Sequence, residues 1–247
     1  MKKLIPNKKR IHNTIHKIFV FLVLSVFTFI SVYAQTFYSS RIKGEQLIYK
    51  NYITISYSIE HNVPNYVGEH LTSSITFGNV QRRSYFYRDN APVSTKMYNN
   101  IGFDRGHMAP AADFKGCIVG MKESFSMFNV APQRPRLNRI YWEELEEYIR
   151  RQLIDCDEIY VVTGTLMTNQ PEKIGIISIP SAFYKAYIGI KDNKKIRSCA
   201  WIYCNTDLEQ SIKDCEMTIN ELEKLIGQNL FPTLNKYDRK TESKILK

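Results

Sequence analysis

The chain has 247 residues, of which 44% are hydrophobic, and it carries a formal net charge of +10 at pH 7. A chain of this length can bury one substantial core but leaves little material for a second domain. The sequence shows no internal repeat and no low-complexity linker, so a repeat array is excluded and we expect one compact domain.

The first 34 residues are typical of an export signal. They contain six basic residues and no acidic residue, and an apolar run over residues 18–32 ends close to Ala34. This pattern predicts a signal peptide over residues 1–34, with cleavage before Gln35 and a periplasmic or extracellular product. A membrane anchor is the alternative, but the run of about 15 apolar residues is shorter than the roughly 20 that span a bilayer. We therefore expect a mature domain over residues 35–247 without stable membrane association.

The high net charge belongs partly to this signal. Removal of its six basic residues lowers the formal net charge from +10 to +4. The remaining basic residues form local clusters, which can still hold a polyanion. These clusters are Arg82, Arg83 and Arg88, then Arg134, Arg136 and Arg139, and finally the basic residues of segment 236–247. For the polar C-terminal segment we favour a solvated surface.

Strand signals recur along the mature chain. They cover residues 52–58, 160–163, 174–180, 183–190 and 196–204. The first run alternates β-branched and aromatic residues, and a charged turn at residues 191–195 separates the last two runs. Together these runs predict an antiparallel sheet that is buried on at least one face.

Two helices are predicted among these strands. The first begins near Asn138 and carries an apolar stripe of residues three and four positions apart, opposite charged residues. The stripe consists of Trp142, Leu145, Ile149 and Leu153. The second covers residues 218–226, with a capping box formed by Thr218 and Glu221 and a stop at Gly227. Strands mixed with a few helices, without regular βαβ alternation, indicate an α+β fold.

All the cysteines lie in the mature part of the chain. They are Cys117, Cys156, Cys199, Cys204 and Cys215. An exported location permits disulfides, but an odd number leaves at least one thiol without an intrachain partner. The spacings contain no CxxC pair, which argues against a zinc site of the paired-cysteine type. A cysteine hydrolase built on Cys117 and His107 is a rival hypothesis, but Cys117 has no evident activating neighbour and we favour an idle thiol.

The residues that carry chemistry lie between positions 102 and 150. In the motif DRGH at residues 104–107, His107 can accept a proton from water near neutral pH. Asp104 and Arg105 can orient the loop and hold a phosphate, while Gly106 permits a tight backbone. A lone histidine is more often structural, so its neighbours decide the interpretation.

Asn138 and Glu146 are the neighbours that matter. Asn138 offers a neutral carbonyl oxygen, which suits magnesium, and Glu146 offers a carboxylate that can hold waters on the same ion. A continuous helix would separate the two by about 12 Å along its axis, at roughly 1.5 Å per residue. Asn138 must therefore reach back from the helix start, or water must span much of the gap. Taken alone, Asn138 would be a helix N-cap and Glu146 a solvated residue.

These motifs resemble the DNA/RNA non-specific endonuclease family, which includes bacterial secreted nucleases and mitochondrial endonuclease G. The resemblance rests on DRGH, on NVAPQ at residues 129–133, and on Asn138 and Glu146 in register with them. The segment YSIEHNVPNYVGEHL resembles the family's first strand and following helix, and VTGTL, IPSAFYKAYI and TINELEKLIG resemble later segments, so the resemblance covers nearly the whole mature chain. It implies a ββα-metal (His-Me finger) active site within the α+β domain.

The resemblance also implies roles for individual residues. His107 matches the general base, Asn138 the direct ligand of one Mg²⁺, and Glu146 the residue that orders the water shell of that ion. Mn²⁺ or another divalent cation is a possible substitute. Asp104 is expected to anchor the loop, and Arg105 is a candidate phosphate contact.

An upstream arginine completes the site implied by the resemblance. The family pattern resembles R-x-x-x-F-x-x-D, which Arg82, Phe86 and Asp89 fit. Arg82 lies closer to DRGH than we expect for relatives, and Arg83 is adjacent to it. Either arginine is therefore a candidate for contacting the phosphate, with Arg82 ahead.

The function implied is hydrolysis of DNA and RNA phosphodiester bonds, with 5′-phosphate products. Water as the nucleophile requires no 2′ hydroxyl, and phosphate contacts fix position rather than sequence, so weak base preference follows. The alternative is a catalytically inactive, secreted nucleic-acid-binding protein that uses the arginine clusters alone. That alternative does not require His107, Asn138 and Glu146 to occur together. The sequence leaves the oligomeric state open.

Overall fold

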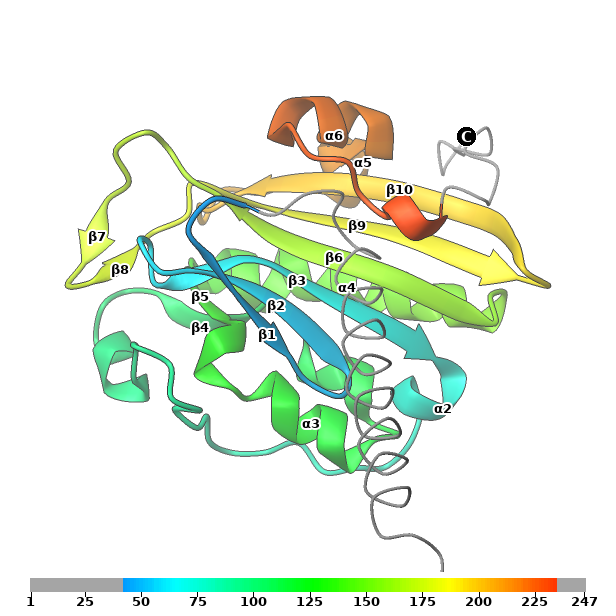
Figure 1. Cartoon of the computed structure of the whole chain (residues 1–247), viewed down its shortest axis with the longest axis horizontal. Coiled ribbons are helices and arrows are strands. Elements are labelled where there is room, and N and C mark those ends of the chain that lie inside the picture. Colours follow the sequence, from blue (N-terminus) through cyan, green and yellow to red (C-terminus); the bar gives the residue numbers. More distant parts are fainter. Residues whose placement is uncertain (1–41, 235–247) are drawn as a thin grey trace, which may run out of the picture.

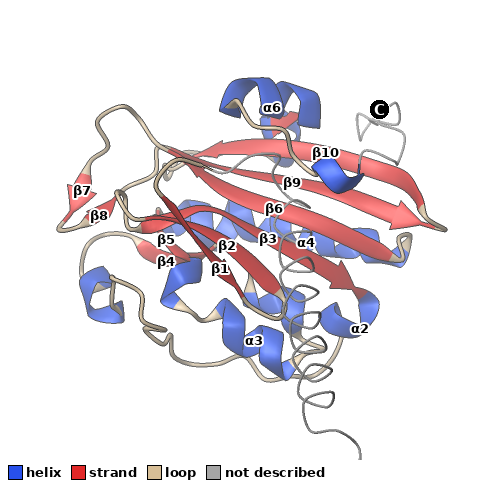
Figure 2. Cartoon of the chain, in the orientation of Figure 1, coloured by secondary structure: helices blue, strands red, loops and turns tan. Residues whose placement is uncertain are grey.

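A seven-stranded sheet forms the centre of the computed structural model, which describes residues 42–234. The strand order is β1-β2-β3-β6-β9-β10-β11, and every neighbouring pair is antiparallel. Figures 1 and 2 show helices on both faces of this sheet. The expected α+β fold with a mainly antiparallel sheet and packed helices is confirmed.

The elements have the following bounds. The strands of the large sheet are β1 (Glu45–Tyr49), β2 (Ile53–Ser58), β3 (Val63–Thr72), β6 (Glu158–Leu166), β9 (Ala182–Lys191), β10 (Lys194–Cys204) and β11 (Glu216–Met217). Two smaller ladders pair β4 (Asp104–His107) with β5 (Val130–Gln133) and β7 (Lys173–Ile174) with β8 (Ile177–Ser178). The α-helices are α2 (Ser73–Thr76), α3 (Ile118–Ser124), α4 (Trp142–Arg151), α5 (Ile212–Cys215) and α6 (Ile219–Ile226).

Most of the predicted strands are confirmed as β2, β6, β9 and β10. The charged turn between β9 and β10 is centred on Asp192 and Asn193, whose φ angles of 49° and 56° suit short polar residues in a tight hairpin. The prediction of one strand over residues 174–180 is wrong, because the chain turns back within it. Gly175 has a φ of 60°, and the run forms the β7–β8 hairpin instead.

The two faces of the sheet are covered by different helices. Helix α4 packs on one face, where Trp142 lies 5.7 Å from the ring of Tyr203 and 5.8 Å from that of Phe183. Helix α6 packs on the other face, where Leu222 joins a separate apolar cluster with Tyr184. Strand β9 is therefore buried on both faces, since neighbouring residues point to opposite sides of a strand. Figure 1 shows α4 behind the sheet and α6 above it.

The helix that begins near Asn138 is confirmed, but its first part is not regular. Helical residues start at Pro135, whose missing N–H costs nothing in a first turn. A π-helical turn over Leu137–Tyr141 follows, and regular α4 begins only at Trp142. The predicted apolar stripe is buried along α4. Asn138 lies within the π-helical turn and is not an N-cap.

The second predicted helix is confirmed with its caps. Thr218 accepts a hydrogen bond from the backbone N–H of Glu221, and the Glu221 carboxylate accepts one from the backbone N–H of Thr218. Gly227 ends the helix with a φ of 67°, in the left-handed region that favours glycine.

The cysteines are all free thiols. Cys156 and Cys199 are buried, and Cys117 caps α3 by accepting a hydrogen bond from the N–H of Gly120 at 3.4 Å. A capping role for Cys117 is the structural alternative to the cysteine hydrolase hypothesis.

Two sequence predictions lie outside the described residues. They are the signal peptide over residues 1–34 and the basic segment 236–247. Within residues 42–234, no helix combines the length and the apolar character that a bilayer span requires.

Candidate active site

The DRGH motif forms strand β4, which pairs with β5, and β5 leads directly into the helix that carries Asn138 and Glu146. Two strands and a helix thus place the predicted residues in one unit. Gly106 is required in this ladder, because a Cβ atom there would lie 2.4 Å from Oε1 of Gln133. The tight backbone expected at this glycine is therefore a close approach of β4 to the Gln133 side chain on β5.

A cleft of about 560 Å³ opens beside this unit. Its lining includes Arg82, Phe86, Asp104, Arg105, His107, Lys115, Asn138, Arg139, Glu143, Glu146 and Arg150. The structure therefore brings together all the predicted site residues except Arg83. Both Asn138 and Glu146 face this cleft, although they are eight positions apart on one helix.

His107 lies between two aromatic rings. Its ring centroid is 4.8 Å from that of Phe86 and 5.0 Å from that of Phe125, and its Nε2 atom is buried without a hydrogen-bond partner. Burial and the positive charges of Arg82 and Arg105 lower the pKa of His107 to about 3. The imidazole is therefore neutral at pH 7 and able to accept a proton. A phosphate bound by the two arginines would offset their charge and raise this pKa, which would make His107 a stronger base.

The depressed pKa of His107 predicts a loss of stability in acid. The unfolded chain takes up this proton near the ordinary pKa of 6.5, and the folded chain only near 3. Between these values the unfolded state binds more protons, so the free energy of unfolding falls as the pH falls. Replacement of His107 by Asn should remove this contribution, which amounts to at most about 1.4 kcal/mol per pH unit.

Urea unfolding of the wild type and His107→Asn, at neutral pH and roughly two units lower, measures this contribution. As the pH falls, the free energy of unfolding should decrease more in the wild type than in His107→Asn. Parallel pH profiles would show that His107 keeps an ordinary pKa in the folded chain.

Asp104 orients the candidate metal ligand. Its Oδ2 accepts a hydrogen bond from Nδ2 of Asn138 at 2.9 Å, and its two oxygens accept bonds from Arg139 at 2.7 and 2.6 Å. Burial raises the pKa of Asp104, but the hydrogen bonds from Arg139 and Asn138 outweigh it and the pKa is lowered. Because the amide nitrogen of Asn138 is held by this carboxylate, its carbonyl oxygen remains to bind a cation.

Glu146 interacts electrostatically with other ionisable groups, among them Lys185, Asp113 and Arg150. Burial raises the pKa of its carboxyl to about 7; Lys185 and Arg150 act in the opposite direction, and Asp113 adds to the increase. Arg150 donates to Asp113 at 2.8 Å and also lines the cleft. A cation bound nearby would favour the ionised form of Glu146.

The donor atoms fit magnesium better than a transition metal. In the described part of the chain, no group of three or more His, Cys, Asp or Glu side chains is arranged to hold a metal ion. An ion in the cleft would therefore depend on the carbonyl oxygen of Asn138 and on waters held by Glu146. Magnesium keeps several of its waters and prefers oxygen ligands, so this sparse set suits it.

The two upstream arginines are placed differently. Arg82 lines the cleft, with its guanidinium 5.3 Å from the ring centroid of Phe125. Arg83 instead stacks at 4.6 Å on Tyr85 and does not line the cleft. The geometry therefore favours Arg82 as the phosphate contact.

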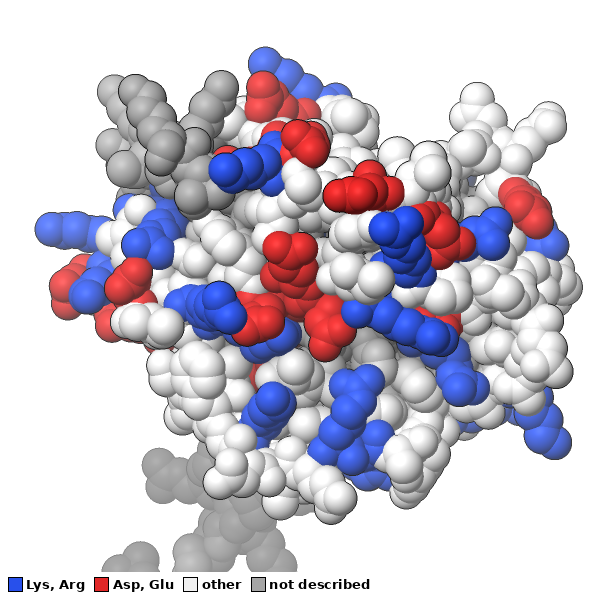
Figure 3. Space-filling model, turned by 180° about the vertical axis from the view of Figure 1, so that it is seen from behind, with Lys and Arg blue, Asp and Glu red and all other residues white. Residues whose placement is uncertain are grey.

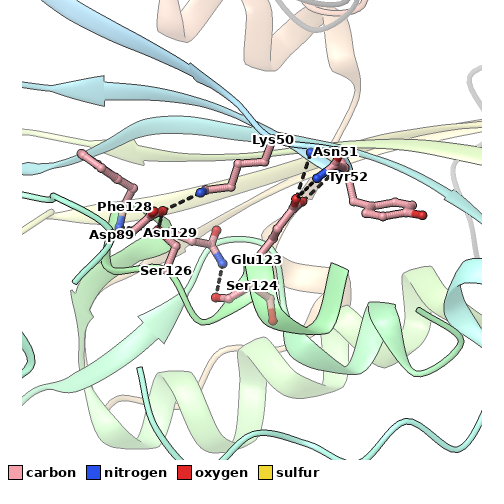
Figure 4. Close-up of polar contacts among 9 residues, drawn as sticks. All are labelled: Lys50, Asn51, Tyr52, Asp89, Glu123, Ser124, Ser126, Phe128 and Asn129. Carbon is pink, nitrogen blue, oxygen red and sulfur yellow. Dashed lines mark hydrogen bonds and ion pairs between the residues drawn. The ribbon is translucent and has the colours of Figure 1, made fainter. Parts of the chain in front are cut away.

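Asp89, the last residue of the family pattern, holds the segment that carries Arg82. Its carboxylate pairs with Lys50 and accepts a hydrogen bond from Ser126 at 2.6 Å, as Figure 4 shows. In the same view, Glu123 on α3 accepts bonds from the chain at Asn51 and Tyr52. The Asp89 contacts fasten the end of the arginine segment to the connection between β1 and β2 and to the chain just after α3, and the Glu123 contacts fasten α3 to the same connection.

Arg105 also faces the cleft. Its guanidinium lies 5.3 Å from the ring centroid of Phe86 and donates a long hydrogen bond of 3.4 Å to the backbone oxygen of Thr95. One edge of the guanidinium is thus held by the protein, and Arg105 keeps the position expected for a phosphate contact.

Sequence reasoning missed several residues of the site. Arg139 and Arg150 line the cleft, and Arg150 lies four positions after Glu146, a spacing that places both on one helix face. Asn129, within NVAPQ, exchanges hydrogen bonds with both backbone groups of Ala109 at 2.9 and 2.8 Å. It therefore fixes the chain just after His107. The helical spacing was a usable signal for Arg150, whereas nothing local indicates the partner of Asn129.

Charge is distributed around the cleft in two zones. Glu143, Glu144 and Glu147 of α4 are exposed, and so are Arg82 and Arg139, which line the cleft together with Glu143. Figure 3 shows the face that carries α4, with acidic side chains near its middle and Lys and Arg side chains around them. An acidic centre favours a cation, and a basic surround favours a polyanion.

Comparisons with known proteins agree with this geometry. The sequence profile of the DNA/RNA non-specific endonuclease family matches residues 34–237. The mitochondrial nuclease EXOG of Danio rerio is 28% identical over 215 residues, which are 78% of this chain and 62% of that protein. A nuclease of Nostoc sp. is also 28% identical, over 76% of this chain and 74% of its own length. This chain therefore spans less than two thirds of the EXOG protein but most of the Nostoc nuclease.

A solved structure supports the same assignment. A chain in the crystal structure of the EndoG/EndoGI complex superposes with a TM-score of 0.69 and 26% identity, covering 77% of this chain and 87% of its own. The ββα-metal fold expected from the sequence is thereby confirmed. With a family profile that covers most of its length and a cleft built from the same motifs, the chain belongs to the DNA/RNA non-specific endonuclease family.

Proposed function

We propose that this protein is an exported, magnesium-dependent endonuclease that hydrolyses DNA and RNA with little sequence preference and leaves 5′-phosphate ends. The observation that carries the proposal is the cleft, which brings His107, Asn138 and Glu146 together with Arg82 and Arg105. Family membership supports nuclease activity and dependence on a divalent metal. The choice of magnesium rests on the oxygen donors described above.

His107 is the proton acceptor in the proposed reaction. Its ring is held between Phe86 and Phe125 and is neutral, so it would take a proton from a water molecule that attacks the phosphorus. The two aromatic rings limit the approach of other waters to the imidazole. A fixed ring orientation favours attack in line with the leaving oxygen.

The remaining residues bind and orient. Arg82 and Arg105 would contact the phosphate oxygens, and Asn138 and the waters of Glu146 would hold the cation. Magnesium, when bound, supplies positive charge that offsets the charge developing on the phosphate and the 3′ leaving oxygen. Asp104 keeps the Asn138 amide in the ligating orientation.

The lack of sequence preference follows from the groups that line the cleft. The arginines and Lys115 can pair with phosphate oxygens, which every nucleotide carries. Since water is the nucleophile, the 2′ hydroxyl has no part in the reaction, and both DNA and RNA are accepted.

The competing proposal is an inactive nucleic-acid-binding protein. Such a protein needs the basic surface but has no use for a neutral buried histidine beside an oriented Asn138 amide. A direct test is digestion of plasmid DNA and single-stranded RNA by the mature chain from Gln35, with Mg²⁺ or with EDTA. We expect both substrates to be degraded with Mg²⁺ and to stay intact with EDTA. Binding of both without cleavage, in any divalent cation, would favour the inactive protein.

Export is tested separately from activity. Expression of the full chain in a bacterial host, followed by mass spectrometry of the protein outside the cytoplasm, should find a product that begins at Gln35. Recovery of the uncleaved chain in the membrane fraction would instead support the anchor.

The contrast between Arg82 and Arg83 gives a matched pair of variants. Arg82→Gln should lower kcat/KM by about 10- to 100-fold, because it removes a charged contact to the phosphate. Arg83→Gln, which changes a residue outside the cleft, should change kcat/KM by less than about threefold. Steady-state cleavage at constant ionic strength measures both, and equal losses would show that the two arginines share the contact.

A further inference from the structure

A lysine is buried behind the residues that line the cleft. Lys185 on β9 is 1% exposed, and its ammonium donates to Oγ1 of Thr163 at 2.6 Å and to the backbone oxygen of Met108 at 3.3 Å. It also lies 5.3 Å from the ring centroid of Trp142. Burial of an ammonium is costly unless charges and hydrogen bonds compensate it, so the groups around Lys185 must supply this compensation.

Three carboxyl groups are close enough to Lys185 for its charge to lower their pKa values. Glu69 on β3 is 1% exposed and has no hydrogen-bond partner on either oxygen, Asp113 is 3% exposed, and Glu146 borders the cleft. Asp113 is paired with Arg150. Lys185 lowers the pKa of both Glu69 and Glu146, which burial raises. Asp113 is thus paired with an arginine, whereas Glu69 has only nearby positive charge to compensate its burial.

Lys185 also contacts the two parts of the chain that carry site residues, namely the chain just after β4 and helix α4. Met108 follows His107 directly, so the hydrogen bond from Lys185 supports the main chain beside the proton acceptor. Trp142 begins α4 and lies four positions before Glu146, on the same helix face. One side chain from the central sheet thus lies against the DRGH strand and against the helix of the metal site.

We propose that Lys185 is a positioning residue, which fixes the main chain behind His107 and packs against Trp142 at the start of α4. The proposal rests on the proposed nuclease function. Lys185 is absent from the residues that line the cleft, so it acts through Met108 and Trp142 rather than on the substrate. The alternative is that Lys185 serves only to compensate the charge of Glu69.

A single variant and a double variant at Glu69 and Lys185 separate these roles. Glu69→Gln removes the buried carboxyl group and keeps Lys185, while Glu69→Gln with Lys185→Met removes both ionisable groups. Thermal unfolding of both shows whether the fold is kept. Two readouts follow, namely kcat and KM for cleavage of DNA with Mg²⁺, and NMR shifts of the His107 ring and the Met108 amide in metal-free protein.

The double variant should have a kcat about 10- to 100-fold below that of Glu69→Gln, with KM nearly unchanged, because misplaced groups slow the chemical step. The His107 and Met108 resonances should move between the two proteins. Equal kcat and equal resonances would show that Lys185 only balances Glu69. A double variant that fails to fold while Glu69→Gln folds would make Lys185 a requirement of the fold, which also overturns the assignment. The NMR comparison shows whether Lys185 positions the chain beside His107 even if neither protein cuts nucleic acid. Absence of cleavage would instead count against the proposed function.

Discussion

Replacement of His107 by alanine is expected to reduce kcat by about 1,000-fold for both DNA and RNA, because a general base contributes roughly 100- to 10,000-fold. The KM should change little, since Arg82, Arg105 and the metal site remain to bind the substrate. Initial rates on a plasmid and on single-stranded RNA measure the effect. The same loss on both substrates is expected, because the proton comes from water in each case.

The chain offers a matched histidine as a control. His70 follows Glu69 in β3 and lies outside the cleft. It forms a hydrogen bond with Glu158 at 2.6 Å and stacks on Tyr160, with 4.3 Å between the ring centroids. His70→Ala should keep kcat within about threefold of the wild type. A His107→Ala protein that is folded and retains more than a tenth of the activity would show that another group accepts the proton.

The sequence patterns that predicted structure correctly depend on interactions between residues that are close together in the chain. The capping box and Gly227 fix the ends of α6 by hydrogen bonds among residues three to five positions apart. The apolar stripe of α4 fixes which helix face is buried, whatever it packs against. The hairpin of β9 and β10 needs only two apolar runs and a polar turn. Each of these features was visible without knowledge of distant residues.

Features that depend on distant partners were not predictable in this way. The helix that the family resemblance implied after the first strand is wrong, because residues 63–72 form strand β3. Pro64 and Gly68 weaken the strand pattern of β3, and pairing with β2 and β6 holds it. Lys185 is charged yet fully buried, and its partners Thr163 and Met108 lie 22 and 77 positions away. A single sequence contains no signal that joins such residues. Hydrophobic patterning alone would place a lysine at the surface.

The candidate site shows the same division. DRGH, Asn138 and Glu146 could be found because they are close in sequence and match a family pattern. The apparent gap of about 12 Å follows from a rise of roughly 1.5 Å per residue over eight residues, and it assumed a regular helix. The π-helical turn over Leu137–Tyr141 changes the direction in which Asn138 points relative to α4, and such turns often occur at functional sites. Its bond to Asp104 then completes the orientation.

Asn138→Ala is expected to weaken the binding of Mg²⁺ more strongly than any other single change in the cleft, because it removes the only direct protein ligand in the proposed site. Loss of a residue that merely orients a ligand costs about 10- to 100-fold in metal affinity. Asp104→Ala should fall in that range, and Asn138→Ala should exceed it. Cleavage rates measured over a range of Mg²⁺ concentrations give the half-saturating concentration for each protein.

Two comparisons make the Asn138 result specific. Asn220→Ala removes an exposed asparagine from α6 and should leave the half-saturating Mg²⁺ concentration unchanged. Asn138→Asp keeps an oxygen ligand but places a second carboxylate against Asp104, so it should bind Mg²⁺ better than Asn138→Ala does while disturbing the pair with Asp104. If Asn138→Ala lowers kcat but leaves the half-saturating Mg²⁺ concentration at the wild-type value, the cation is held elsewhere. Asn138 would then act on the substrate, and the proposed ligand set would have to be replaced.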